Sequence, residues 1–311
     1  MASKFSAGSG RVWLWLSILL FLFALPGCSI QKLAVDRLGK ALAEGSSVYA
    51  EDDDPELVGA ALPFGLKTIE ALLVQSPHDK GLLLAATSGF TQYAYAFVQT
   101  QADFIEDSDI SKAIALRERA ERLYRRALGY GIRGLEEVQP GFAGLLKTDP
   151  SKALAPFGRK DVPLLYWTAV SWGAAISLDK TNAALSADLP SVEAMVVRAM
   201  ELDREFDEGV LYDFMIAYEG GRPAAGGGSI DRAREALDQA VKLSRGRRAA
   251  PLVSFAETVD ISIQDKAEFK KLLDQALAID INSAPDQKLA NVIAQRRARW
   301  LLGRMDRLFL D

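Results

Sequence analysis

Apolar side chains recur at steps of three and four residues through most of the chain, and this spacing constrains the fold more strongly than any other feature of the sequence. Such steps place apolar side chains along one face of an α-helix, while the alternation typical of strands is almost absent. The sequence therefore predicts an all-α fold. The clearest stripes are Leu62, Leu66, Ile69 and Leu73; Leu116, Ala120, Leu123 and Ala127; Ala233, Leu237, Ala240 and Leu243; and Phe269, Leu272, Leu273 and Ala276.

Polar residues mark the starts of two of these helices. Asp54 precedes Pro55, and a carboxylate there can accept hydrogen bonds from the free N–H groups of a first turn that tolerates proline. Asp265 and Glu268 have the spacing of a capping box. The alternative to a helix cap is that the run of aspartates ending at Asp54 forms a calcium-binding loop. Such a loop would need more oxygen ligands and a glycine at the right position. Pro63 lies inside the helix that Asp54 begins and predicts a kink or a restart.

Three of the expected helices share a short pattern around an alanine. Ala199, Ala240 and Ala276 hold equivalent places, separated by 41 and 36 residues. These helices resemble the second helix of a degenerate tetratricopeptide repeat, whose period is about 34 residues. Stacked helix pairs of that kind form a solenoid with a concave groove that usually binds other molecules. We therefore expect a degenerate tetratricopeptide-like helical-repeat solenoid, built as a single domain over residues 51–311.

The beginning of the chain has the pattern of a secretory signal. Lys4 and Arg11 precede an uncharged apolar run from Val12 to Leu25, and a Pro-Gly break follows. A retained transmembrane helix is the alternative. The fourteen residues of the run would rise only about 21 Å as a helix, less than the roughly 30 Å hydrocarbon core of a bilayer.

The sequence Leu25-Pro26-Gly27-Cys28 resembles the bacterial lipobox, in which the cysteine is lipidated and becomes the mature N-terminus, although Pro26 departs from the usual pattern. The resemblance implies a lipoprotein signal peptide over residues 1–27 and a lipidated N-terminus with a lead-in helix over residues 28–50. It also implies attachment to a lipid membrane through acylated Cys28 without a span. Ser29 rather than Asp after the cysteine favours the outer over the inner membrane, with the body on the periplasmic side.

The composition excludes several classes of function. Cys28 is the only cysteine and His78 the only histidine, so Ser-His-Asp and Cys-His catalysis and the usual zinc sites are excluded. The chain has 37 basic and 41 acidic residues, without the basic excess of a nucleic-acid-binding protein. We therefore expect a protein that is not an enzyme, with no cofactor, no metal and no nucleic-acid partner.

Between Lys80 and Asp103 the chain carries no charge, yet it has a polar stripe of Ser88, Gln92, Tyr95 and Gln99. Glutamines and hydroxyls are costly in lipid, which argues against a transmembrane helix here. Two interpretations stay open for the stripe. It forms hydrogen bonds to neighbouring helices, or it lines a ligand cleft or an axial channel.

A second uncharged stretch, Val162 to Leu178, contains Tyr166, Trp167 and Trp172. These aromatics either pack in the core or form the wall of a pocket for a mostly apolar molecule. In the last long helix, Leu289, Ile293, Arg296 and Trp300 share one face. A guanidinium on an apolar face must find an anion, which is either an internal carboxylate or an anionic group of a ligand.

Longer blocks resemble the T-component family of tripartite ATP-independent periplasmic (TRAP) transporters, over roughly residues 28 to 309. The blocks are DDDPELVGAALPFGLKTIEALL, GFTQYAYAFVQTQAD, LYWTAVSWGAAISL, SFAETVDISIQDKAEFKKLLDQALAID and LANVIAQRRARWLL. The resemblance implies periplasmic lipoproteins with a tetratricopeptide-like fold, which form homo-oligomers, expected to be trimers, and dock the solute-binding protein. It supplies no catalytic residues.

The resulting hypothesis is an accessory protein that binds the TRAP solute-binding protein and holds an apolar or carboxylated solute in its groove. The alternative is an envelope assembly scaffold whose repeats bind peptides or other lipoproteins. The residues expected to line the ligand cleft are Gln92, Tyr95, Gln99, Tyr166, Trp167, Trp172 and Arg296.

Overall fold

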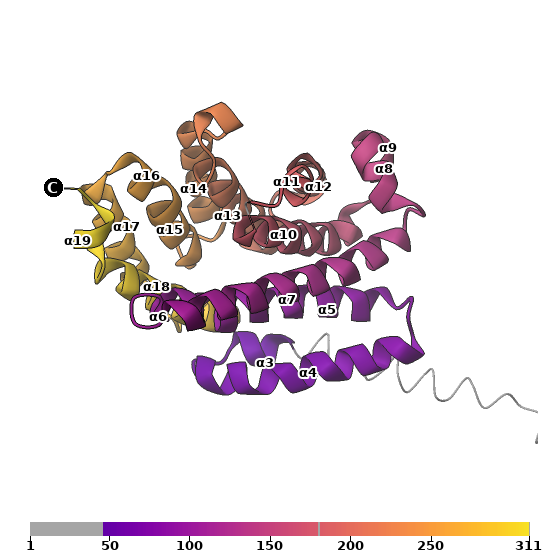
Figure 1. Ribbon diagram of the computed structural model, residues 1–311, viewed down its shortest axis with the longest axis horizontal. Helices are drawn as coiled ribbons and strands as arrows, with labels where there is room; N and C mark the ends of the chain where they lie inside the picture. The colour runs from indigo at the N-terminus through magenta and orange to yellow at the C-terminus, as the bar shows by residue number, and fades with distance from the viewer. Residues whose placement is uncertain (1–45, 180, 311) are drawn as a thin grey trace, which may run out of the picture.

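The structure is a computed structural model that describes residues 46–179 and 181–310. Every regular element in these two ranges is a helix, as Figure 1 shows, so the all-α prediction is confirmed. The signal peptide over residues 1–27, Cys28 and most of the lead-in helix lie outside the described residues.

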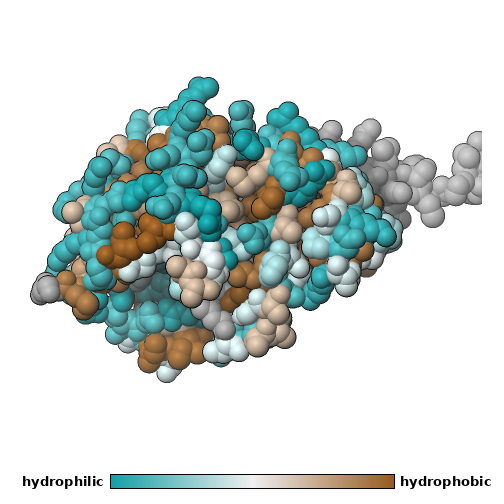
Figure 2. Space-filling model, turned by 90° about the horizontal axis from the view of Figure 1, so that it is seen from above, coloured by the Kyte–Doolittle hydropathy of each residue, from teal (hydrophilic) through white to brown (hydrophobic). Residues whose placement is uncertain are grey.

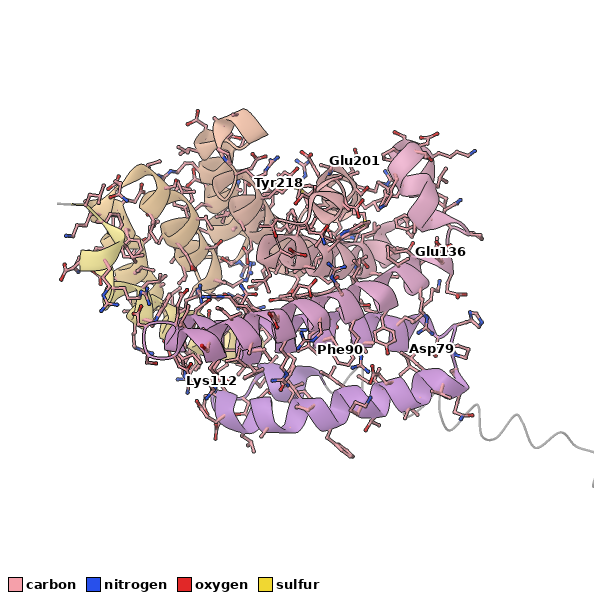
Figure 3. All side chains as sticks on the ribbon, in the orientation of Figure 1. Asp79, Phe90, Lys112, Glu136, Glu201 and Tyr218 are labelled. Carbon is pink, nitrogen blue, oxygen red and sulfur yellow. The ribbon has the colours of Figure 1, made fainter. Side chains whose placement is uncertain are left out.

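The N-terminal half is organised around the long helix α7 (Ile110–Glu136), which packs against α5 (Lys80–Tyr93) and α10 (Val162–Leu178). Helix α4 (Pro55–Gln75) packs on α5. Figure 3 shows Asp79 at the turn between α4 and α5 and Glu136 at the same end of the molecule. The other elements of this half are α3 (Ser46–Ala50), η1 (Ala94–Gln99), α6 (Thr100–Ile105), α8 (Phe142–Thr148), α9 (Pro150–Leu154) and η2 (Arg159–Asp161).

The C-terminal half continues with helices that pack on their neighbours in sequence. Helix α12 (Leu189–Asp203) packs on α10, α13 (Phe206–Gly220) on α14 (Ile230–Leu243), and α17 (Lys266–Ala278) on α18 (Lys288–Leu302). The remaining elements are α11 (Ala183–Ser186), η3 (Ala224–Gly226), α15 (Ala250–Phe255), η4 (Ala256–Asp260), α16 (Ile261–Ile263), η5 (Pro285–Gln287) and α19 (Met305–Leu308).

The helices follow a curved path that brings the end of the chain back to its beginning. In Figure 1, α18 lies beside α6, and α18 also contacts α3 and α4. Arg304 and Arg307 bind the Asp107 carboxylate at 2.8 and 2.7 Å and so tie α19 to the segment between α6 and α7. The described residues therefore form an arc whose two ends touch.

Small side chains set the close packing of the helices. Ala199, Ala240 and Ala276, the alanines of the predicted repeat, are all fully buried, one each in α12, α14 and α17. An alanine at a contact lets two helix backbones approach more closely than a larger residue would. The tetratricopeptide-like arrangement itself stays a prediction.

The expected capping residues begin their helices. The Asp54 carboxylate accepts a hydrogen bond from the Leu57 amide at 3.0 Å, and Asp265 accepts one from the Glu268 amide at 2.9 Å. The Glu268 side chain binds Arg234 on α14, so its carboxylate serves an inter-helix ion pair. Helix α4 continues through Pro63 without a restart.

Helix α13 begins with a turn whose residues have left-handed backbone conformations. Asp207, Glu208 and Gly209 have φ angles of 45°, 53° and 87°, although residues other than glycine rarely adopt this left-handed region and almost never consecutively. The turn is held from the loop before α15. Arg247 forms an ion pair with the Glu208 carboxylate, and Arg248 lies 3.4 Å from the Glu208 carbonyl oxygen.

Two glycines of α7 offer a matched test of the packing of α7 against α10. A Cβ added at Gly131 would lie 3.0 Å from Cβ of the buried Thr168 on α10 and closer still to its hydroxyl, whereas one at Gly129 would meet nothing within 4 Å. We expect Gly131→Ala to lower the free energy of unfolding by about 1–3 kcal/mol because the α7–α10 contact is overpacked. Gly129→Ala should raise it by up to about 1 kcal/mol through helix propensity. Urea denaturation of both variants measures the difference, and equal effects would contradict the packing described.

Candidate binding site

The polar stripe at the end of α5 divides into an exposed and an engaged part. Gln92 and Tyr95 are exposed, and Gln99 is half-buried. The Tyr124 hydroxyl on α7 donates a hydrogen bond to Gln99 Oε1 at 2.6 Å. Gln99 therefore follows the hydrogen-bonding interpretation, while Gln92 and Tyr95 stay accessible to a ligand.

The aromatic residues of α10 lie mainly in the core. Tyr166 and Trp172 are buried in the hydrophobic cluster around α10, and Trp167 is half-buried beside it. The rings of Tyr166 and Trp167 meet edge to face with centroids 5.0 Å apart. Indole Nε1 of Trp172 has no hydrogen-bond partner among the described residues. Core packing thus accounts for most of the contacts of Tyr166 and Trp172.

Arg296 has an internal partner. Its guanidinium binds both carboxylate oxygens of Glu56 at the start of α4, with Nη2 at 2.9 Å from Oε2. The apolar face that carries Arg296 is not the most deeply buried face of α18, because Leu289, Ile293 and Trp300 are only half-buried. The buried residues of α18 are instead Asn291, Ala294, Gln295, Arg297, Ala298 and Leu301.

The physical reason for this difference is that two amides of α18 complete the backbone bonding of neighbouring segments. The Asn291 side chain accepts from the Ala249 amide and donates to the Arg247 carbonyl oxygen, both at 2.8 Å. Gln295 Nε2 donates to the Ile279 carbonyl oxygen at 2.8 Å, just after α17 ends. Buried polar side chains with such partners are stable in a core, although a count of apolar residues does not find them.

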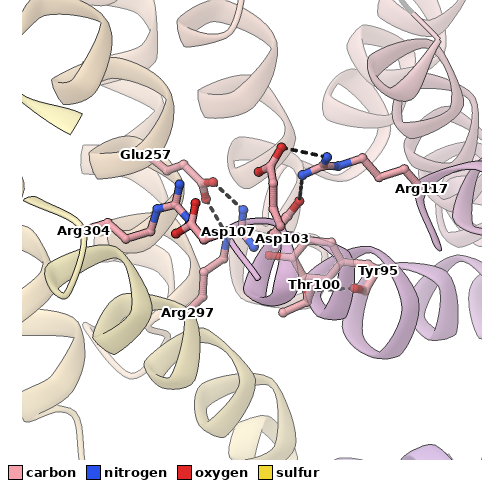
Figure 4. A network of polar contacts seen from close by, with 9 residues as sticks. Tyr95, Thr100, Asp103, Asp107, Arg117, Glu257, Arg297 and Arg304 are labelled. Carbon is pink, nitrogen blue, oxygen red and sulfur yellow. Dashed lines mark hydrogen bonds and ion pairs between the residues drawn. The ribbon is translucent and has the colours of Figure 1, made fainter. Parts of the chain in front are cut away.

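Arg297 is the centre of a buried ionic network, which we call the Arg297 cluster and define as Arg297, Asp103, Glu257 and Arg117 (Figure 4). Arg297 Nε donates to Glu257 Oε2 at 2.6 Å and Nη1 to Asp103 Oδ2 at 3.1 Å. Arg117 Nη2 donates to Asp103 Oδ1 at 3.0 Å. The cluster links η4, α18, α6 and α7, so it joins the two ends of the arc.

Two residues in and near the Arg297 cluster lie in π-helical turns. Tyr95 lies in η1, and Glu257 lies in η4. A π turn contains one more residue than an α turn and leaves a backbone carbonyl in altered geometry, and such turns are frequent at functional sites. The Thr100 hydroxyl donates to the Tyr95 carbonyl oxygen at 2.8 Å and helps to satisfy it.

Tyr95 and Asp207 combine solvent exposure with a raised pKa. Tyr95 is 43% exposed, and Asp207 is also exposed, yet burial raises the pKa of both side chains. Figure 2 shows the upper face of the molecule hollowed on the side of the C-terminal helices.

A second buried arginine lies under Tyr166. Arg248 is 5% exposed and forms an ion pair with Asp213, whose pKa is raised by burial against the attraction of the guanidinium. Burial also raises the pKa of Tyr166, with the negative charge of Asp213 adding to the effect. Two of the aromatic residues predicted from the sequence, Tyr95 and Tyr166, therefore each lie near an arginine that a carboxylate neutralises.

These groups favour binding over chemistry. The arginines are engaged by carboxylates, and burial raises the pKa of both tyrosines further above neutral pH. In the described part of the chain, no three His, Cys, Asp or Glu side chains are grouped so that they could hold a metal ion. The exposed residue Tyr95 offers a hydroxyl group, and the half-buried Trp167 offers an aromatic ring.

Removal of the Arg297 guanidinium should open the end of the arc. Arg297→Ala leaves the Glu257 and Asp103 carboxylates without their shared partner, which costs about 3–5 kcal/mol for a buried charge pair. Arg299→Ala, an exposed site on the same helix, should change the free energy of unfolding by less than about 0.5 kcal/mol. Chemical denaturation measures both, and similar losses in the two variants would contradict the central role of the cluster.

Asp260 on η4 makes stability depend on pH. The residue is fully buried, and neither carboxylate oxygen has a hydrogen-bond partner among the described residues. Burial and the nearby Glu268 raise the pKa of Asp260 to about 7, against the attraction of Arg234. In the unfolded chain an aspartate has a pKa of about 3.9. The unfolded state therefore loses the proton first, and stability falls as pH rises between these two values.

Asp260→Asn should remove this dependence. The stability of the variant relative to the native protein is expected to grow from about pH 4 to pH 7, by up to about 1.4 kcal/mol per pH unit, and then to level off. Asp238→Asn, an exposed change, controls for the loss of one charge. Unfolding measured over pH 4–8 tests this expectation, and a constant difference between variant and native protein would contradict it.

Comparison with known proteins shows the family of the chain. The sequence model of the TRAP transporter T-component family matches residues 51–309. A protein of Treponema pallidum (strain Nichols), named only as an uncharacterized protein, is 32% identical over 303 residues, covering 92% of this chain and 94% of that protein. The family match spans α4 through α19 and includes the whole Arg297 cluster. The chain therefore belongs to the TRAP transporter T-component family, an accessory family of TRAP transport.

Proposed function

We propose that the protein is a lipid-anchored, non-enzymatic accessory component of a TRAP transport system that binds the solute-binding protein. Acylated Cys28 holds it on the periplasmic side of the envelope, with the outer membrane as the preferred location. The observation that carries the proposal is the family match over residues 51–309, because it covers α4 through α19. The lipobox at Cys28 supports the anchor.

The helical body supports a role in binding. In this proposal the body is a degenerate tetratricopeptide-like solenoid, and the fully buried alanines of α12, α14 and α17 support the equivalence of those helices. The solenoid binds the solute-binding protein and assembles into homo-oligomers, with a trimer as the expected size. Helical-repeat surfaces of this kind usually bind other proteins.

The hollow beside the Arg297 cluster is the proposed site for an apolar or carboxylated solute. Tyr95 is accessible there and can donate a hydrogen bond to a carboxylate, while Gln92 is exposed one helical turn away. Trp167 is half-buried and adds an aromatic surface. Arg296 contributes indirectly in this proposal, because its guanidinium already binds Glu56.

Native mass spectrometry tests the proposal. The mature protein is mixed with the periplasmic solute-binding protein encoded near it, and we expect a complex together with a bound small molecule. Tyr95→Trp, which partly fills the hollow, should lower the fraction that carries the small molecule and leave the complex intact. Val197→Trp, an exposed site on α12, is the control. Binding of peptides or other lipoproteins without the solute-binding protein would support the assembly-scaffold alternative and contradict this proposal.

The anchor has its own test. Cys28→Ala removes the thiol that accepts the lipid, so the precursor should stay uncleaved and unlipidated. Labelling with a radioactive or clickable fatty acid, followed by membrane fractionation, measures both steps. Ser29→Ala leaves the cysteine in place and should be processed normally. A Cys28→Ala variant that still incorporates lipid would rule out the lipobox.

A further inference from the structure

Helix α4 carries an apolar face that no other described helix covers. Leu57, Phe64 and Val74 are 59%, 80% and 75% exposed, and Ala60 and Ala71 on the same side are exposed too. In Figure 1, α4 forms the lower edge of the molecule, with none of the described helices beneath it. By length and composition, α4 is apolar enough to cross a membrane.

The inner side of α4 is fixed to the body, so the apolar face cannot turn inward. Leu66, Ile69 and Leu73 are buried against α5. The Glu70 carboxylate is also buried, and it accepts a hydrogen bond from the Tyr130 hydroxyl on α7 at 2.7 Å and binds Arg126. The outer face is therefore held toward the surroundings in a defined orientation.

The exposed residues have the spacing of a helix-pairing seam. Residues 57, 60, 64, 67, 71 and 74 follow steps of 3 and 4 in alternation, the heptad spacing that packs one helix against another. All but Lys67 are apolar, and two are alanines that permit close approach. Large exposed apolar strips on a soluble body usually have an occupant. The spacing points to a helix as that occupant.

The chain has such a helix pattern immediately before the described residues. Apolar residues at 30, 34, 38 and 41 share one helical face, with Val35 and Leu42 beside them. The charged residues Lys32, Asp36 and Lys40 fall on the opposite face, and Arg37 lies at the edge of the apolar face. As a helix, residues 30–42 would be about 20 Å long, and the strip from Leu57 to Val74 extends about 26 Å. The segment is therefore long enough to cover about three-quarters of the strip.

The described residues also begin beside α4, on the flank of α4 that carries the buried Val58 and not on the strip itself. The Tyr49 hydroxyl on α3 lies 3.8 Å from the position of a Cβ on Gly65, so α3 passes close to the middle of α4. Only residues 43–45 separate the amphipathic segment from Ser46, where α3 begins. Such a short tether gives the segment a high effective concentration at α4.

We propose that residues 30–42 form an amphipathic helix that packs on the outer face of α4. The packing itself does not depend on the proposed function. A consequence that does rest on it concerns orientation: with Cys28 acylated, only Ser29 separates the lipid from the docked helix. The α4 side of the body is then held at the bilayer and the hollowed face points away from it.

Hydrogen–deuterium exchange of the mature chain, residues 28–311 with Cys28→Ser and without detergent, tests the packing. We expect the amides of residues 34–42 to exchange at least about tenfold more slowly than in a free peptide of the same sequence. Phe64→Asp and Leu38→Asp should each remove that protection, because each places a charge in the interface, while α7 and α10 keep theirs. Phe64 is exposed in the body, so its substitution leaves the core intact. Val197→Asp on α12 is the matched control and should have no effect.

Three results would overturn the proposal. If residues 34–42 exchange as fast in the native chain as in the free peptide, the segment is not docked. Protection that appears only as protein concentration rises would assign the strip to a second copy. Protection of α4 that appears only after addition of phosphatidylglycerol-containing vesicles would assign it to the bilayer.

Discussion

The pairing of Arg297 with Glu257 and Asp103 is the interaction on which the shape of the molecule depends. The three residues come from α18, η4 and α6, so a single buried guanidinium fixes helices that are 194 residues apart in the chain. Each carboxylate would be costly to bury alone, and the arginine would be costly without them. Because these charges satisfy one another, α18 and η4 at one end of the arc are joined to α6 at the other.

Local physical rules predicted much of the fold. The apolar steps gave the helices, and Asp54 and Asp265 cap the helices that they were expected to begin. The sequence analysis selected Arg296 and missed Arg297, the centre of the Arg297 cluster. Neighbouring residues of a helix are rotated by about 100° around its axis, so the two side chains lie on different faces. Apolar counting could not find the right face because Asn291 and Gln295 are buried for their hydrogen bonds. The π turns and the left-handed turn at Asp207 depend on partners distant in sequence, which no local pattern records.

The residues of the candidate site were also predicted only in part from the sequence. Tyr95 is exposed, whereas Tyr166 and Trp172 serve mainly the core, and the ligand cleft stays a prediction. Their helix is apolar all round, so periodicity could not separate a wall of a cleft from a buried face. Family membership places the chain in TRAP transport as an accessory component.

The distance across the closure tests the central role of Arg297 most directly. In a Cys28→Ser background the chain has no other thiol, so spin labels can be placed at Lys112→Cys on α7 and Arg299→Cys on α18, two exposed sites. Pulsed electron paramagnetic resonance should give one narrow distance distribution in the labelled protein. With Arg297→Gln added, the distribution should broaden and shift to longer distances. An unchanged narrow distribution would show that the arc closes without the Arg297 cluster and would contradict this account.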